Sequence, residues 1–204
     1  MENPNAFWDK RYESQEYVYG IAPNRYFQQQ LDAIEKPGRL LLLAEGEGRN
    51  AVYAAEKGWQ VTAVDFSTSG RDKALALARE RGTTIDYLLA DIQHFDFAKF
   101  GAWEAIGLVY AHFPPEWRTS IHQKCAKALA PGGKILLEAF NRKQLSRLSG
   151  GPKDVEMLYS KILLEEDFEL LTPVEAAELT ILLNEGDGHS GLAEVVRACF
   201  QKRP

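Results

Sequence analysis

Two glycines and one acid stand at a spacing that could hold a nucleoside. Gly46 and Gly48 follow the apolar run 40–44, where glycine lets the backbone turn sharply and approach a ligand closely. Asp65 ends the next apolar run, 19 residues after Gly46. An acid about 20 residues after such a turn meets the hydroxyls of a bound ribose. The spacing therefore predicts a strand–helix–strand unit that binds an adenosine.

The cofactor that carries this adenosine has two candidates on these residues. The letters GEGRNA at 46–51 fit the G-x-G-x-x-G/A pattern, so an NAD(P)-dependent oxidoreductase is one hypothesis. Against it, the chain has no room for a substrate domain of the usual dehydrogenase size, and it closes with two β-rich runs, 179–183 and 192–200. Asp91, directly after the third expected strand, is well placed to receive an adenine amino group. These features favour a sulfonium cofactor.

The composition is that of an ordinary globular protein. With 204 residues and 45% hydrophobic side chains, we expect a single domain over 1–204, with 1–36 as a helical cap over the cofactor site. The net charge of -5 argues against a nucleic-acid partner. No run approaches the roughly 18 apolar residues of a membrane span, and none suits a signal peptide, so we expect no membrane association and a cytoplasmic location.

The two cysteines, Cys125 and Cys199, match neither a metal-binding pattern nor a disulfide framework. We therefore expect two buried thiols and no metal site. We also expect a monomer or a weak homodimer.

Alternating strand and helix patterns predict the fold. Strands are expected at 39–44, 60–65, 85–89, 103–110, 135–140, 179–183 and 192–200, with helices between most of them. Ser67 is a suitable helix cap, and residues 155–168 look mostly helical, with the acids at 165–167 on a solvated face. The pattern predicts a doubly wound, Rossmann-like α/β fold whose seven-stranded, mostly parallel sheet has an antiparallel last strand.

Five segments together resemble class I S-adenosylmethionine (SAM)-dependent methyltransferases over nearly the whole chain. They are FWDKRY at 7–12, GEGRNAV at 46–52, VTAVDFS at 61–67, AD at 90–91 and LAPGG at 129–133. The branch that looks most similar contains the tellurite-resistance methyltransferases, with thiopurine methyltransferases more distant. The resemblance implies SAM as cofactor and a small-molecule methyl acceptor, including soft nucleophiles such as a thiol, selenite or tellurite.

The resemblance also implies which residues bind SAM. Asp65 would hold the ribose, Phe66 would pack on the adenine, and Asp91 with the Ile92 amide would read the adenine edge. The first motif of the family usually carries an acid and a glycine where this chain has Leu42 and Ala44, and Glu45 is the candidate replacement for that acid. The full set implied is Trp8, Arg11, Tyr12, Tyr19, Ala44, Glu45, Gly46, Gly48, Asn50, Asp65, Phe66, Ser67, Asp91, Ile92 and Ala111.

Two histidines are candidates for a general base. His112 follows the fourth expected strand, and His189, in a glycine-rich loop, matches a histidine of tellurite-resistance relatives. His94 and His122 look like surface or helix-face residues. A soft anionic acceptor needs no base, whereas an amine or hydroxyl acceptor does. Because no residue is an obvious general base, a SAM-binding module without catalysis is a further alternative.

Overall fold

The computed structural model describes residues 4–97 and 99–204. Its elements in chain order are α1 Pro4–Tyr12, α2 Arg25–Asp32, β1 Arg39–Leu43, α3 Arg49–Glu56, β2 Gln60–Asp65, α4 Thr68–Glu80, β3 Asp86–Leu89, β4 Trp103–Val109, α5 Pro115–Ala128, β5 Leu129–Phe140, the short 3-10 helices η1 Arg142–Ser146 and η2 Val155–Met157, α6 Lys161–Asp167, β6 Thr172–Glu185 and β7 His189–Gln201.

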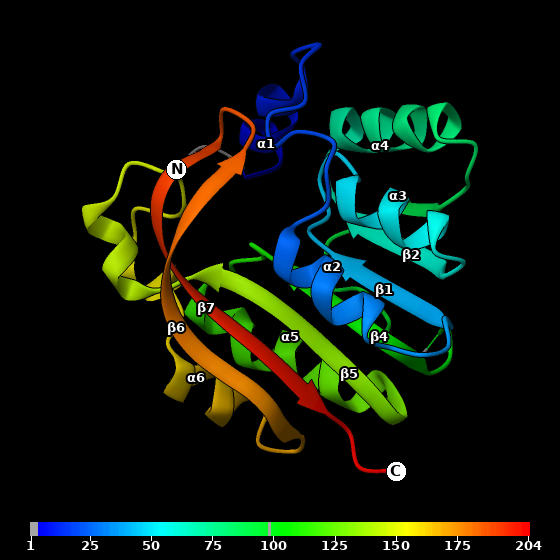
Figure 1. The fold of residues 1–204 in the computed structure, drawn as a ribbon, viewed down its shortest axis with the longest axis vertical. Coiled ribbons are helices and arrows are strands. Elements are labelled where there is room, and N and C mark those ends of the chain that lie inside the picture. The colour runs from blue at the N-terminus through cyan, green and yellow to red at the C-terminus, as the bar shows by residue number, and fades with distance from the viewer. Residues whose placement is uncertain (1–3, 98) are drawn as a thin grey trace.

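The strands of the described chain form one seven-stranded sheet in the order β3-β2-β1-β4-β5-β7-β6 (Figure 1). Neighbouring strands from β3 through β5 pair in parallel, whereas β7 pairs antiparallel with both β5 and β6. The predicted fold class is confirmed. The order of the strands reverses between β1 and β4, and ligands of such sheets bind beyond the carboxyl ends of the strands at this switch point.

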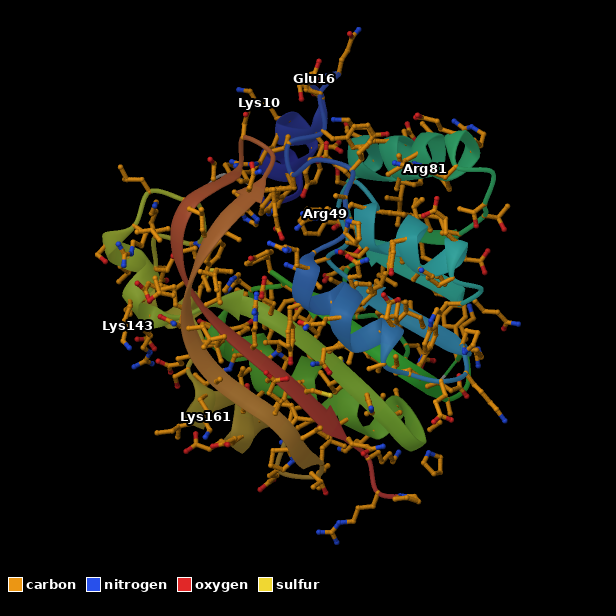
Figure 2. All side chains as sticks on the ribbon, viewed as in Figure 1. Lys10, Glu16, Arg49, Arg81, Lys143 and Lys161 are labelled. Carbon is orange, nitrogen blue, oxygen red and sulfur yellow. The ribbon has the colours of Figure 1, made fainter. Side chains whose placement is uncertain are left out.

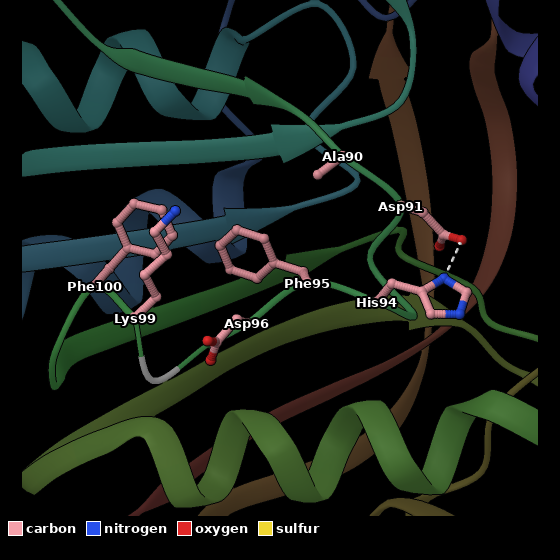
Figure 3. A pocket seen from close by; sticks show the side chains of 7 residues that line it. All are labelled: Ala90, Asp91, His94, Phe95, Asp96, Lys99 and Phe100. Atoms are coloured by element: carbon pink, nitrogen blue, oxygen red, sulfur yellow. Dashed lines mark hydrogen bonds and ion pairs between the residues drawn. The ribbon is translucent and has the colours of Figure 1, made fainter.

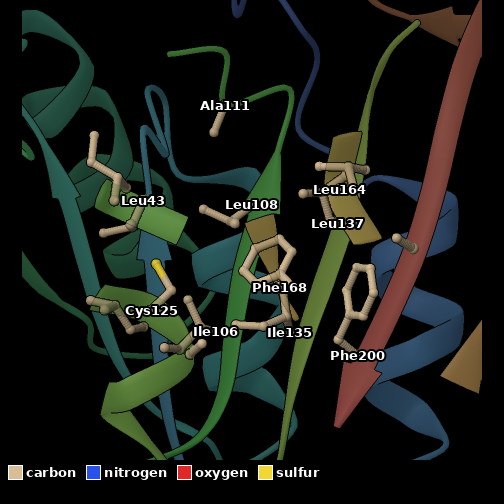
Figure 4. Packing of buried hydrophobic residues seen from close by; sticks show 14 of the residues in the cluster. Leu43, Ile106, Leu108, Ala111, Cys125, Ile135, Leu137, Leu164, Phe168 and Phe200 are labelled. Carbon is tan, nitrogen blue, oxygen red and sulfur yellow. The ribbon is translucent and has the colours of Figure 1, made fainter. Parts of the chain in front are cut away.

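Helices cover both faces of the sheet, which explains why the central strands are apolar throughout. Helices α2, α3 and α4 pack on one face, where Phe27, Val52 and Leu77 join the core. Helices α5 and α6 pack on the other face, where Cys125, Phe168 and strand residues form a second cluster (Figure 4). Strands that are buried on both faces read as continuous apolar runs, which is why β1 and β4 could be recognised in the sequence.

The β6–β7 hairpin is longer than the sequence indicated, and it bends back to the edge of the sheet where α1 lies (Figure 1). The backbone N–H of Gly188, in its turn, donates to the carbonyl of Val18 at 3.0 Å. This contact brings the first residue of β7, His189, to the carboxyl ends of β1 and β4.

The contact between α5 and α6 differs from what the sequence suggested. His122 and Asp167, which were expected on solvated faces, are both buried, and His122 Nδ1 lies 2.8 Å from Asp167 Oδ2. Arg118 and Thr119 also donate to this carboxylate. The periodicity of a single helix cannot reveal that an acid such as Asp167 is paired with residues of a second helix. The four-residue spacing of Trp117, Ile121, Cys125 and Leu129 predicts a helix with one buried stripe, but Trp117 is 37% exposed.

Within residues 4–97 and 99–204, no helix has the length and apolarity needed to cross a bilayer. No group of three or more His, Cys, Asp or Glu side chains in these residues is arranged to hold a metal ion. Cys125 and Cys199 are buried free thiols, as predicted.

Candidate active site

The glycine turn and Asp65 form one hydrogen-bonded unit. Gly46 and Gly48 both have left-handed backbone angles, with φ of 58° and 85°. Asp65 Oδ2 accepts from the Gly46 N–H at 3.0 Å, and Oδ1 accepts from the Ser67 N–H at 2.9 Å. Each carboxylate oxygen keeps a second lone pair, which is the acceptor arrangement that two ribose hydroxyls need. Burial raises the pKa of Asp65, and these backbone bonds oppose that rise.

Steric contacts explain why glycine stands at both positions of the turn. A Cβ on Gly48 would lie 2.4 Å from the Cβ of Ala74 in α4. A Cβ on Gly46 would lie 2.6 Å from the hydroxyl oxygen of Tyr12. Only a residue without a side chain lets this turn pass between α1 and α4.

Backbone strain marks the switch point of the sheet. Among the described residues other than glycine, only Ala44 and Tyr110 have positive φ, at 53° and 52°. They directly follow β1 and β4, the two central strands. Such a conformation costs an alanine or tyrosine about 1–2 kcal/mol, and it concentrates at functional sites. Ala44 therefore adopts the conformation that the glycine of the usual first motif adopts freely.

Glu45 caps the helix that follows the turn. Its Oε1 accepts from the backbone N–H groups of Asn50 at 2.9 Å and Ala51 at 2.7 Å. Burial raises the pKa of Glu45 to about 7, against the lowering effect of these hydrogen bonds. Asn50 in turn accepts from the Asn24 N–H through Oδ1. Both side chains thus order the first turn of α3, and a contact to SAM stays a prediction for them.

An aromatic cover closes the turn from the amino-terminal side. Asp9 fixes α1 by accepting from Ser67 Oγ at 2.7 Å and from the Ser69 N–H at 2.9 Å. The rings of Trp8 and Tyr12 are stacked with centroids 5.6 Å apart, and Tyr19 meets Tyr12 edge-on at 6.5 Å. The structure thus brings together Trp8, Tyr12 and Tyr19, the three amino-terminal aromatic residues that the resemblance assigned to the cofactor.

The side of the site expected to bind adenine is open. Phe66 is half-buried after β2, and Ile92 is buried after β3. Asp91 Oδ1 accepts from the Gln93 N–H, and Oδ2 lies 2.8 Å from His94 Nδ1 (Figure 3). Beyond Asp91 the surface is hollowed by an open cavity of about 260 Å³, lined by Ala90, Asp91, His94, Phe95, Asp96, Lys99 and Phe100. Ala111 lies buried after Tyr110, at the end of β4.

His189 is buried against aromatic rings at the same edge of the sheet. Its ring lies 4.4 Å from that of Tyr19 and 4.3 Å from that of Tyr110, measured between centroids. Its Nδ1 faces Glu185 Oε2 at 3.5 Å, and the same oxygen accepts from Arg49 at 2.8 Å. Burial lowers the pKa of His189, and the charges of Arg49 and Arg11 lower it further, against the raising effect of Glu185.

His112 has contacts that differ from those expected of a base. Its Nδ1 lies 2.6 Å from the carbonyl oxygen of Met157, and its Nε2 accepts from the Phe140 N–H at 3.2 Å. Burial lowers its pKa to about 4. With both ring nitrogens committed to the backbone, His112 joins β5 to the segment before α6. This geometry favours a structural role, and we do not assign His112 to catalysis.

Comparisons with known proteins agree on one family. A model of the methyltransferase domain matches residues 40–133. The chain is 37% identical over 111 residues to a ubiquinone biosynthesis O-methyltransferase of Idiomarina loihiensis, a match that covers 52% of this chain and 43% of the relative. Over residues 40–133 the chain thus matches the methyltransferase-domain family, the family that the sequence motifs resemble.

Solved structures of class I methyltransferases share the fold. The N-methyltransferase NodS from Bradyrhizobium japonicum WM9, in complex with S-adenosylhomocysteine, superposes with a TM-score of 0.74 at 16% identity and full coverage of both chains. TehB from Haemophilus influenzae gives a TM-score of 0.72 at 18% identity, covering 98% of this chain and 67% of TehB. At such identities the likeness concerns the fold. The chain also spans less than half the length of its ubiquinone-pathway relative, so that relative's acceptor does not carry over.

The residues of this site fit SAM. A buried carboxylate with free lone pairs, two glycines in close contact with their surroundings, and a further exposed acid at the end of β3 lie in chain order along one sheet edge. These are the groups that a ribose, a methionine tail and an adenine amino group require. SAM, when bound, supplies a methyl group on a positively charged sulfur.

The sequence analysis missed a buried network beneath this site. Glu138, at the end of β5, accepts from Asn24 Nδ2 at 2.6 Å and from the Tyr110 hydroxyl at 2.8 Å. Arg197 of β7 pairs with its other oxygen. A single acid inside the otherwise apolar run 135–140 was an available signal. No comparable signal marked Glu185, whose hydrogen-bond donors Asn24 and Arg49 are distant in sequence.

Proposed function

We propose that this chain transfers a methyl group from SAM to a small-molecule acceptor held beside His189. One observation carries the proposal: the Tyr19 ring contacts both Tyr12, which covers the glycine turn, and His189, which begins the last strand. One ring therefore joins the proposed cofactor site to the histidine at the switch point.

The residues around the Tyr19 ring suit methyl transfer. Transfer from a sulfonium needs the nucleophile, the methyl group and the sulfur in line, and alignment of this kind contributes about 7–11 kcal/mol. Aromatic faces such as those of Trp8, Tyr12 and Tyr19 attract a cation by about 0.5–2 kcal/mol. The loop at Gly150 and Gly151 passes close over the rings of His189 and Phe140, which keeps water away from that side.

His189 is the residue we propose as general base. Its lowered pKa keeps the imidazole neutral at pH 7, so the ring can accept a proton. A proton on Nδ1 faces Glu185, and this leaves the lone pair of Nε2 for the acceptor. A hydroxyl or amine acceptor gives its proton to Nε2 as it attacks the methyl group.

The acceptor class follows from the aromatic rings that pack around His189. Tyr19, Tyr110 and Phe140 present rings rather than a polar groove, which suits a small molecule with an apolar or soft reacting group. A thiol, selenite or tellurite reacts without a base, whereas a hydroxyl or amine depends on His189. The names of the relatives include both an O-methyltransferase and an N-methyltransferase, so they favour no single acceptor atom.

The test combines binding and turnover. Calorimetric titration with SAM and with NAD(P)H should show binding of SAM alone. Production of S-adenosylhomocysteine is then measured with a panel of thiols, phenols, amines, selenite and tellurite. SAM binding without turnover on the whole panel would support a non-catalytic SAM-binding module instead. NADPH binding in place of SAM would support the oxidoreductase.

A further inference from the structure

Arg11 is an exposed cation at the border between the proposed cofactor side and the acceptor side. Its guanidinium carbon lies 5.6 Å from the centre of the Tyr19 ring, 5.7 Å from that of Trp8 and 5.9 Å from that of Phe7. In the part of the chain that the structure describes, no carboxylate pairs with it. A guanidinium next to ring faces keeps N–H donors at its edge available for an anion.

Two observations place this cation toward His189. The Tyr19 ring that contacts Arg11 also contacts the ring of His189, at 4.4 Å. The charge of Arg11 opposes the rise that burial causes in the pKa of Tyr19, and it lowers the pKa of His189. Arg11 therefore lies within electrostatic reach of the acceptor side.

The charges near the glycine turn, here the cofactor side, differ from those near His189. On the cofactor side Asp65 and Glu45 are acids, and Glu47 is paired with Lys73 at 2.6 Å. On the side of His189, Glu185 is paired with Arg49 at 2.8 Å, and Arg11 is a further cation beside the Tyr19 ring. An acidic side suits the sulfonium, and a cationic side suits an acceptor of opposite charge.

We infer that Arg11 binds the negative charge of the methyl acceptor, so that the acceptor is a small anion or carries an anionic group near its reacting atom. This inference rests on the proposed function, because it takes the surroundings of His189 as the acceptor side. The sequence left two anions open for Arg11, the carboxylate of SAM and an anionic substrate, and the inference selects the substrate. It also makes Arg11 a residue that determines specificity.

The experiment separates the acceptor from the cofactor. The protein, saturated with S-adenosylhomocysteine, is titrated with sodium selenite by calorimetry at low ionic strength and pH 8. Wild type should bind selenite, and Arg11→Gln should bind it at least tenfold more weakly. Arg11→Lys, which keeps the charge but loses the fork of donors, should fall between them. Lys10→Gln is the matched control, because Lys10 is the preceding residue of the same helix and points outward (Figure 2).

The affinity for SAM decides between the two anions that Arg11 could hold. It should stay within twofold of wild type in all three variants. Unchanged selenite binding in Arg11→Gln, no selenite binding by wild type, or a tenfold loss of SAM affinity in Arg11→Gln would each overturn the inference. Arg11-dependent selenite binding without turnover on any acceptor would refute the proposed function and leave the anion site standing.

Discussion

The two halves of the sheet edge are built in different ways. On the cofactor half, after β1 and β2, two buried carboxylates are held by backbone N–H groups only a few residues away or across the adjoining strand. Asp65 with Gly46 and Ser67 is one case, and Glu45 with Asn50 and Ala51 is another. On the acceptor half, after β4 and β5, side chains hold one another across the whole chain. Asn24 and Glu138 are an example, as are Arg49 and Glu185.

Under the proposed function, this difference means that SAM binding and methyl transfer depend on different kinds of contact. Backbone donors give the cofactor half a geometry that tolerates side-chain change elsewhere. Side-chain networks give the acceptor half a geometry that depends on each member, because a buried polar group that loses its partner is strongly disfavoured. We therefore expect variants of the acceptor half to change turnover, and variants of the cofactor half to change SAM affinity.

The largest effect should come from His189→Gln. With a hydroxyl or amine acceptor, kcat/KM should fall by about 10²–10⁴-fold, because the base is removed while the amide keeps similar bulk. SAM affinity measured by calorimetry should stay unchanged. Glu166→Gln, at an exposed residue of α6, serves as control. If turnover of every acceptor survives the change at His189, catalysis does not use this histidine as a base.

The next effect concerns the stability of the acceptor half. Asp167→Ala should lower the free energy of unfolding by about 3–5 kcal/mol, because Arg118 and His122 lose their buried partner. Glu166→Ala, at an exposed neighbour, should leave stability nearly unchanged. Urea denaturation measures both. Equal stability of the two variants would show that the network between α5 and α6 contributes little.

On the cofactor half, Gly48→Ala should lower the free energy of unfolding by about 2–4 kcal/mol, from overpacking together with backbone strain. The new Cβ would lie 2.4 Å from that of Ala74. Gly82→Ala is the matched control, since Gly82 also has positive φ but nothing lies within 4 Å of its added Cβ. The same urea experiment should show the control losing only the strain, about 1–2 kcal/mol. Comparable losses would remove the packing argument.

A smaller effect should appear as pH dependence. The folded protein holds His112 neutral with a pKa of about 4, below the ordinary value of 6.5, so its contribution is fully present above pH 6.5 and is lost as the pH falls toward 4. Burial lowers the pKa of His122 and His189 as well, so they add to this loss. His112→Asn should destabilise the protein at pH 7.5 by about 1–3 kcal/mol and reduce the loss of stability between pH 7.5 and 5. Unfolding free energies at both pH values test this, and an unchanged difference between them would contradict it.

The same contrast explains which parts of the fold and the site could be predicted from the sequence. The glycine turn, Asp65 and the order of strands and helices were predictable because they follow from local spacing and from apolar runs buried on both faces. Trp8, Tyr12 and Tyr19 were also named correctly as a group that lies together. Their contact with SAM stays a prediction.

The acceptor half was predicted less well, because its partners meet only in the folded chain. His112 looked like a base until the carbonyl of Met157 and the N–H of Phe140 were seen to occupy its ring. Asp167 looked solvated, although its partners lie 45 to 49 residues earlier on α5. No local sequence pattern indicated the backbone strain at Tyr110. The only sign of the buried role of Glu138 was a single acid in an apolar strand.

The most direct test of the central claim is the affinity of the Asp65→Ala variant for SAM, measured by calorimetry beside wild type and Asp72→Ala, a control at an exposed acid. Loss of the hydrogen bonds to this carboxylate should weaken SAM binding by about 1–3 kcal/mol, with the control unchanged. SAM affinity that is the same in all three proteins would contradict the placement of the cofactor at the end of β2.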